Sequence, residues 1–96
     1  MTDEASEVLH NEAASRFELR VQGQVAFAQY HLVDGVMWIT HTETPPPLQG
    51  RGLAARVVRA ALDHARAQGL KVRPACSYVR AYLRRHPEQQ DLVAAS

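Results

Sequence analysis

Apolar and polar residues alternate along the first half of the chain, and this period of two predicts strands. The first strand is expected where apolar and charged side chains take turns, at Phe17, Glu18, Leu19, Arg20 and Val21. After a Gln22-Gly23 turn, a second strand is expected over 25–33, with Phe27 on one face. The other face carries Ala26, Ala28, Tyr30 and Leu32. Asp34-Gly35 favours a tight hairpin turn, because both of its central positions need positive φ. With a third strand over 36–43, residues 16–43 are predicted to form an antiparallel meander.

The apolar spacing becomes helical after the prolines at 45–47, which offer no hydrogen-bond donor to a sheet. A helix is predicted over 52–68, and Gly69 is placed to end it. The apolar stripe of this helix consists of Ala54, Val57, Val58, Ala61, Leu62 and Ala65. A short strand is expected over 70–73. A second helix is expected over 77–86, with Val79, Tyr82 and Leu83 near one face, and Pro87 ends it.

These elements predict an α+β (mixed α/β) domain in the order β-β-β-α-β-α, with an extra strand at 7–10 as an option. The strand–helix–strand unit spans about 35 residues, which allows the last strand to pair in parallel with the third. The sheet is therefore expected to be mostly antiparallel with one parallel pair. Residues 1–96 are expected to form a single domain, in which residues 1–5 are a loose tail.

Composition limits the classes of function. Hydrophobic residues make up 46% of the chain, so it can bury a core. The net charge of +1 argues against a general nucleic-acid binder. Cys76 is the only cysteine, which excludes an internal disulfide and a cysteine-rich zinc site and fits a reducing cytoplasm. No metal site is expected. No membrane contact is expected either, since no apolar run reaches about 18 residues and the acidic start is unlike a signal peptide.

The segment Gln49-Gly50-Arg51-Gly52-Leu53-Ala54 lies between the third strand and the first helix. A glycine-rich turn at a helix start exposes backbone N–H groups at the positive end of the helix dipole, where phosphates bind. Glycines at such a place can also do no more than shape the turn. The pattern indicates a ligand that carries phosphate or pyrophosphate.

These six residues fit the pattern Gln/Arg-x-x-Gly-x-Gly/Ala, the acyl-CoA pyrophosphate motif of the GNAT superfamily of N-acetyltransferases. Over about residues 8–93 the chain resembles a family of very small, single-domain GNAT-like enzymes. It departs from that family at Ala54, where many members have glycine, at Ser77 in place of a proline, and at Gln89 in place of a tyrosine. The segments that carry the resemblance are 11–14 with 16–19, 41–46, 50–52, 61–66, 69–76 and 85–88.

The resemblance implies a minimal GNAT-like fold and the transfer of an acetyl group from acetyl-CoA, the cosubstrate, to an amine. It implies that the third strand splays from its neighbour and pairs with the pantetheine arm near residues 41–44, an interruption that the prolines fit. The side chain of Arg51 would add charge to the phosphate site. The residues expected to contact the cofactor are Thr42, Thr44, Gln49, Gly50, Arg51, Gly52, Leu53, Ala54 and Tyr82.

Three residues are candidates for catalysis. Glu43 or His41 could act as the general base, and period-two alternation places both on one face of the strand with Met37 and Ile39. Both could equally be structural or solvated residues at the strand end. Cys76 stands between a strand end and a helix start, where the dipole lowers a thiol pKa. It could form an acetyl-cysteine, lie beside the CoA sulfur, or simply fill a tight junction.

Two further features have both a functional and a packing interpretation. Tyr82 could protonate the leaving CoA thiolate, or it could pack in the core. Arg80, Arg84, Arg85 and His86 could attract the 3′-phosphate of CoA, or they could form a solvated helix face.

The favoured function is an acetyl-CoA-dependent N-acetyltransferase that acts as a monomer or homodimer. So small a fold leaves an open acceptor site, which suits a protein lysine, a peptide or a small amine. The alternative is a non-catalytic sensor or regulatory module that binds CoA or acetyl-CoA and needs no base. A nucleic-acid or nucleotide phosphate binder is a third reading, which the near-zero charge and the 6% of aromatic residues disfavour.

Overall fold

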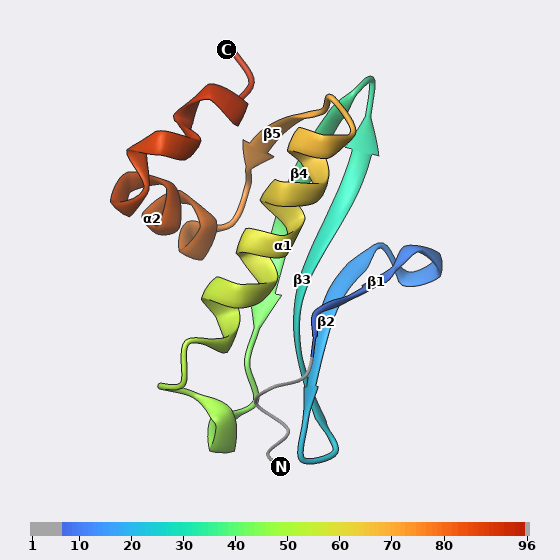
Figure 1. Ribbon diagram of the computed structural model, residues 1–96, viewed down its shortest axis with the longest axis vertical. Coiled ribbons are helices and arrows are strands. Elements are labelled where there is room, and N and C mark those ends of the chain that lie inside the picture. Colours follow the sequence, from blue (N-terminus) through green and yellow to red (C-terminus); the bar gives the residue numbers. More distant parts are fainter. Residues whose placement is uncertain (1–6, 96) are drawn as a thin grey trace.

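The computed structural model, which describes residues 7–95, contains one five-stranded sheet in the order β1-β2-β3-β4-β5 (Figure 1). Neighbouring strands are antiparallel except β4 and β5, which are parallel. The expected meander and the single parallel pair are confirmed. The extra strand lies one residue or two later than expected, and the proposed tail at 1–5 falls outside the described residues. The strands are β1 (Leu9–Asn11), β2 (Arg16–Val21), β3 (Gln24–Val33), β4 (Val36–Glu43) and β5 (Lys71–Pro74).

Two α-helices follow the meander, α1 (Leu53–Ala67) and α2 (Ser77–Arg85). Short 3₁₀ turns lie at η2 (Glu12–Ala14), η3 (Pro46–Leu48) and η4 (Pro87–Leu92). Gly69 ends α1 as expected: its φ is 71°, and the N–H of Leu70 donates to the carbonyl of Ala65 at 2.8 Å. This is the hydrogen bond that closes a helix through a left-handed residue.

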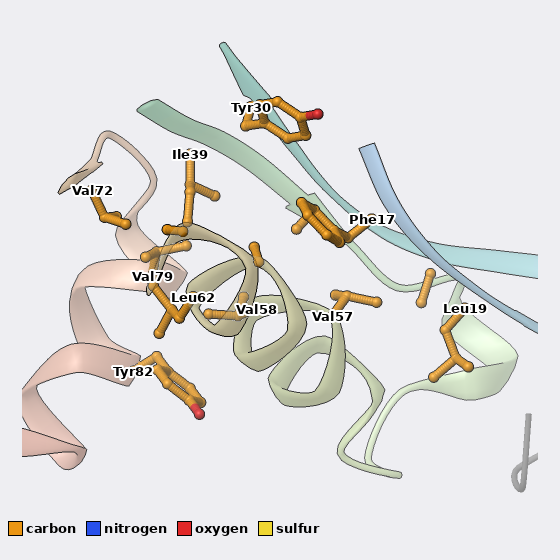
Figure 2. Packing of buried hydrophobic residues seen from close by; sticks show 14 of the residues in the cluster. Phe17, Leu19, Tyr30, Ile39, Val57, Val58, Leu62, Val72, Val79 and Tyr82 are labelled. Atoms are coloured by element: carbon orange, nitrogen blue, oxygen red, sulfur yellow. The ribbon is translucent and has the colours of Figure 1, made fainter. Parts of the chain in front are cut away.

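The hydrophobic core lies between α1, α2 and one face of the sheet, called here the inner face. Figure 2 shows Phe17 and Leu19 of β2 and Ile39 of β4 pointing toward α1, while Val79 of α2 lies beside Leu62. The expected stripe of α1 is confirmed with one difference. Leu53 is buried, while Ala54 is half-buried and lines a cleft described below.

A β-bulge interrupts β4 at Thr40. Tyr30 pairs with Ile39, while its neighbour Gln29 pairs with His41, so Thr40 has no residue opposite. The hydroxyl of Thr40 instead donates to the carbonyl of Gln29 at 3.4 Å. An extra residue in one strand shifts the side-chain alternation by one, so β4 exchanges faces at this point.

The bulge corrects one expectation. Ile39 is fully buried on the inner face, whereas His41 and Glu43 are exposed and pair with residues of β3 whose side chains point to the opposite side. His41 and Glu43 therefore do not share a face with Met37 and Ile39. Period-two alternation gave the wrong answer because it holds only in an uninterrupted strand.

The opposite side of the sheet, called here the outer face, has no helix packed on it within residues 7–95, since α1 and α2 both contribute to the core on the inner face. Contacts between aromatic rings and neighbouring side chains show which residues pack together on the outer face. Phe27 lies beneath the guanidinium of Arg16, 3.8 Å from its ring centroid, and beside His41. Trp38 lies near Arg73 in the same way.

Candidate acetyl-CoA site

The turn before α1 has the geometry of an anion-binding loop. Gly50 has a φ of 85° and Gly52 a φ of 76°, left-handed conformations that side-chain-bearing residues rarely adopt. Gly52 is also the N-cap of α1, and it supplies no side chain to cap the helix. The first N–H groups of a helix have no partner within the helix. Those of α1 therefore face the space in front of this turn.

A cleft with a volume of about 450 Å³ opens beside this turn. It runs between the end of β4, the loop after it and the beginning of both helices. Gln49 stabilises the loop, because its side-chain amide donates to the carbonyl of Thr44 at 3.1 Å. The residues lining the cleft are Thr42, Glu43, Thr44, Leu48, Gln49, Gly50, Gly52, Leu53, Ala54 and Tyr78.

The cleft lies where β4 and β5 separate. Their pairing stops at Ile39 and Pro74, with one further bond from the N–H of Ala75 to the carbonyl of Ile39 at 3.0 Å. Beyond this point β4 continues to Glu43, while the other chain turns into α2 at Ser77. The two strands thus part, and the last residues of β4 have no β5 partner. This is the interruption that the family resemblance implies.

Cys76 and Thr42 face each other across this gap. The Sγ of Cys76 and the Oγ1 of Thr42 are 3.7 Å apart, although 34 positions separate the residues. Cys76 is the N-cap of α2. Burial acts to raise the pKa of Cys76, but hydrogen bonds from the N–H of Val79, from the Thr42 hydroxyl and from the N–H of Tyr78 hold it below the ordinary value. The thiol therefore forms a thiolate more readily than a free cysteine.

His41 and Glu43 form a pair on the outer face. The Nε2 of His41 lies 3.2 Å from the Oε1 of Glu43, and the side chains are 56% and 59% exposed. Glu43 also lines the cleft, so this pair connects the cleft with the outer face at the end of β4. A carboxylate beside an imidazole can accept a proton and pass it on.

The two tyrosines of α2 lie in different places. Tyr82 packs among Leu62 and Val79 between the helices, and its ring stacks on His86 with the centroids 4.1 Å apart (Figure 2). It is not among the residues that line the cleft, whereas Tyr78 is. Burial raises the pKa of Tyr78, although Arg85 acts to lower it. The sequence suggested no role for Tyr78, and the signal was its position directly after the cysteine and helix start.

The structure brings together most of the residues expected at the site. Thr42, Thr44 and the expected residues of the turn line the cleft, except Arg51, and Glu43 lines it too. His41 and Cys76 stand outside the lining set but each contacts a member of it.

Within residues 7–95, no group of three or more His, Cys, Asp or Glu side chains could hold a metal ion, and no helix is long and apolar enough to cross a membrane.

The mixed α+β sheet with its one parallel pair defines the class as a GNAT-like fold, and sequence comparison identifies the family. Residues 16–92 match the family described as GCN5-related N-acetyltransferase. The chain belongs to this family, which confirms the resemblance seen in its motifs.

Curated relatives and a solved structure are similar over most of the chain. Protein NATD1 of Gallus gallus is 28% identical over 89 residues, covering 90% of this chain and 81% of that protein. The Homo sapiens protein of the same name is 28% identical and covers 88% of this chain and 78% of its own length. The NMR structure of a GCN5-like protein from Staphylococcus aureus has a TM-score of 0.69 at 26% identity and covers 85% of this chain and 83% of its own. That likeness supports the same mixed α+β fold.

Proposed function

We propose that this protein is an N-acetyltransferase that takes its acetyl group from acetyl-CoA and transfers it to an amine. The observation that carries the proposal is a continuous cleft that joins the Gly50–Gly52 turn to the end of β4 that β5 does not pair with. A phosphate site and a free strand edge meet there, and CoA needs both, because it carries a pyrophosphate and an amide-containing arm.

The backbone supplies most of the binding. The N–H groups of Gly50, Arg51, Gly52, Leu53 and Ala54 would hold the pyrophosphate at the positive end of α1. The backbone of β4 near Thr42 and Thr44 would hydrogen-bond the pantetheine arm, since no strand in the described part of the chain pairs with that edge. Gln49 contributes indirectly, because its bond to Thr44 fixes the loop that joins the two parts.

The His41–Glu43 pair is the candidate base. An amine becomes nucleophilic only after its ammonium form loses a proton, and Glu43, supported by His41 at 3.2 Å, can accept that proton directly or through water. When bound, acetyl-CoA supplies the activated acyl group. The chain has to orient this group, remove the proton from the amine and stabilise the departing sulfur.

Cys76 and a tyrosine are candidates for the sulfur side of the reaction. Cys76 could attack the thioester carbonyl as a thiolate, giving acetyl-cysteine and CoA thiolate, and the amine would then displace the cysteine thiolate. In the direct alternative the amine attacks first, and a protonated phenol gives its proton to the CoA sulfur. Tyr78, which lines the cleft, is better placed for this than Tyr82.

Calorimetric titration with acetyl-CoA, CoA and ATP in parallel tests the proposal. Micromolar binding of both CoA species without comparable ATP binding is expected. Release of CoA thiol in the presence of a panel of lysine peptides, polyamines and small amines then tests transfer. A protein that binds neither CoA species would contradict the proposal, and its glycine turn would be only a turn.

One observation favours a second function, that of a non-catalytic CoA-binding module. More than half of each side chain in the His41–Glu43 pair is exposed, whereas bases are usually tuned by burial and neighbours. Tight CoA binding with no acetylation of any amine in the panel would support this function.

A cytoplasmic location is part of the proposed function and rests on the free thiol of Cys76.

A further inference from the structure

We propose that the outer face of the sheet binds the acceptor as an extended polypeptide whose target lysine is flanked by acidic residues. This inference rests on the proposed function and names its substrate class. It follows from the side of β4 on which the base lies, from the open sheet, and from the charges placed around the base.

The β-bulge at Thr40 decides the side from which the amine approaches. After the bulge, Thr42 points toward Cys76 and the cleft on the inner side, while His41 and Glu43 point to the outer face. Glu43 reaches the edge of the cofactor cleft from the outer face, so the base stands between the cleft and that face. An amine that gives its proton to Glu43 while attacking a group in the cleft has to come from the outer face.

The shape of the outer face favours an extended chain over a small molecule. Sites for small molecules are concave and bury most of the ligand. The outer face is instead a sheet surface with no helix over it in residues 7–95, and its aromatic side chains are partly open: Trp38 is 37% exposed and Phe27 is half-buried. A polypeptide can lie across such a surface and contact it at several positions.

Guanidinium groups lie on both sides of the His41–Glu43 pair. Arg16 and Arg20 come from β2, two strands away from β4, and Arg73 comes from β5 on the other side, opposite Trp38 and before the pair along β4. Within residues 7–95, Arg73 contacts neutral groups: the ring of Trp38, at 5.1 Å from its centroid, and the carbonyl of Ala95, at 3.2 Å. Its charge therefore remains available to a ligand.

The carboxylate of Glu18 does not cancel the charge of the β2 arginines. Glu18 is only 6% exposed, and its oxygens lie 3.5 Å from Arg16 Nε and 3.7 Å from Arg20 Nη2. It also accepts a bond from the Asn11 side-chain amide at 3.1 Å. Two arginines thus share one buried carboxylate, so a ligand meets a positive surface there. Glu43, between the arginines, is the exposed anion that suits a lysine ammonium.

Strand spacing sets the sequence register of the acceptor. Strands lie about 4.8 Å apart, so Arg16 is about 10 Å from the centre of the site, and an extended chain covers that distance in about three residues. Acidic residues about three positions from the lysine are therefore expected to meet Arg16 and Arg20. Arg73 lies opposite Trp38, further back along β4, so an acidic residue on that side is expected about four or five positions from the lysine.

Fluorescence anisotropy with labelled peptides tests this inference without acetyl-CoA. A peptide with a central lysine flanked by glutamates is expected to bind about tenfold more tightly than peptides flanked by serines or arginines, and to weaken with salt. The double variant Arg20→Gln with Arg73→Gln should lose this preference. Arg59→Gln with Arg84→Gln, on the helices, removes the same charge and should keep it. If the first double variant fails to fold, the unmodified protein tests the inference instead, because its affinity for the glutamate-flanked peptide should fall as the salt concentration rises.

Other outcomes would overturn the inference. Equal affinity for all peptides, or equal losses in both double variants, would show that the outer face does not select acidic chains. Tighter binding of an oligothymidylate would assign the face to single-stranded nucleic acid. A dimer in sedimentation that the Arg20 and Arg73 changes dissociate would assign it to a second copy of this chain.

Parallel titration with acetyl-CoA distinguishes a failure of the acceptor inference from a failure of the proposed function. If acetyl-CoA binds and a small amine is acetylated, but acidic peptides are not preferred as acceptors, this inference alone fails. If acetyl-CoA does not bind, the proposed function fails, and any peptide preference reports only a binding surface. With turnover, the Arg20 and Arg73 changes should raise KM for the acidic peptide about tenfold and leave kcat unchanged.

Discussion

Thr42 Oγ1 and Cys76 Sγ lie 3.7 Å apart and join the end of β4 to the N-cap of α2. The contact spans the point where β4 and β5 part. It places a cysteine of lowered pKa beside the cleft that opens at the Gly50–Gly52 turn. The cysteine, the free edge of β4 and the glycine turn thus meet at one end of the sheet.

The reactivity of Cys76 is expected to depend on Thr42. Because the Thr42 hydroxyl helps to hold the pKa of Cys76 below its ordinary value, alkylation by iodoacetamide should begin at a lower pH than for a free cysteine. Thr42→Val removes that hydroxyl with little change of shape, so the midpoint of the alkylation rate should move to higher pH. Measuring the rate against pH checks this.

Cys76→Ala then separates the two chemical routes. If acetyl-cysteine forms, turnover should stop while CoA binding remains, and the acetylated thiol of the unmodified protein should be visible by mass spectrometry. Turnover that survives in Cys76→Ala would leave the direct route, and an alkylation midpoint that Thr42→Val does not move would contradict the role of the hydroxyl.

Gly52→Ala should weaken CoA binding for reasons of backbone geometry. A residue with a side chain at a φ of 76° costs about 1 kcal/mol or more, and the turn would relax away from its phosphate-binding shape. Gly69→Ala is the matched control, because Gly69 has a φ of 71° at the other end of α1.

Chemical denaturation and calorimetry distinguish the two glycine variants. Both should lose similar stability, and only Gly52→Ala should lose CoA affinity. Equal CoA affinity in both variants would show that the turn does not hold the phosphates.

Glu43→Gln should slow transfer without changing CoA binding. The amide keeps the size of the side chain but cannot accept a proton, and general bases contribute about 10²-fold or more to the rate. The chain offers a matched control in Glu88→Gln, because Glu88 also lies 3.2 Å from a histidine, His86, but after α2. Steady-state kinetics with a saturating amine checks both variants, and equal rates in the two would remove Glu43 from the mechanism.

The protein is expected to lose stability in mild acid through His10. Burial and the neighbouring His64 lower the pKa of His10, although Glu12 acts to raise it. His10 stacks on Phe17 with ring centroids 4.2 Å apart, and its Nε2 shares a hydrogen bond with the hydroxyl of Tyr30. As the pH falls below the ordinary histidine pKa, the unfolded chain takes up this proton before the folded one. The contribution of His10 to stability is therefore present above about pH 6.5 and is lost as the pH falls through the folded pKa.

Urea denaturation at about pH 7.5 and about pH 5.5 measures this effect. His10→Gln should show a smaller difference between the two conditions than the unmodified protein. His31→Gln, which changes an exposed histidine on the outer face, should show the same difference as the unmodified protein. If His10→Gln retains the full difference, the acid sensitivity has another source.

The sequence by itself determined the local elements. Alternation over 16–43 and the Asp34-Gly35 turn, where φ is 51° and 78°, were enough for the meander, because hairpin geometry is set by neighbouring residues. Gly52 and Gly69 likewise marked both ends of α1, since left-handed caps are a property of glycine. The glycine motif also indicated the family, which the match over residues 16–92 confirmed.

Only the tertiary structure decided how the site is arranged. The bulge at Thr40 depends on the register between β3 and β4, which no local pattern encodes, and it moves His41 and Glu43 to the outer face. The choice of Tyr78 over Tyr82 at the cleft depends on how α2 packs against α1. The contact between Thr42 and Cys76 joins residues 34 positions apart. Helix propensity and capping act between residues that are near in the sequence, whereas strand register and packing depend on the whole core. The positions of the candidate catalytic residues depend on register and packing, so the sequence alone did not determine them.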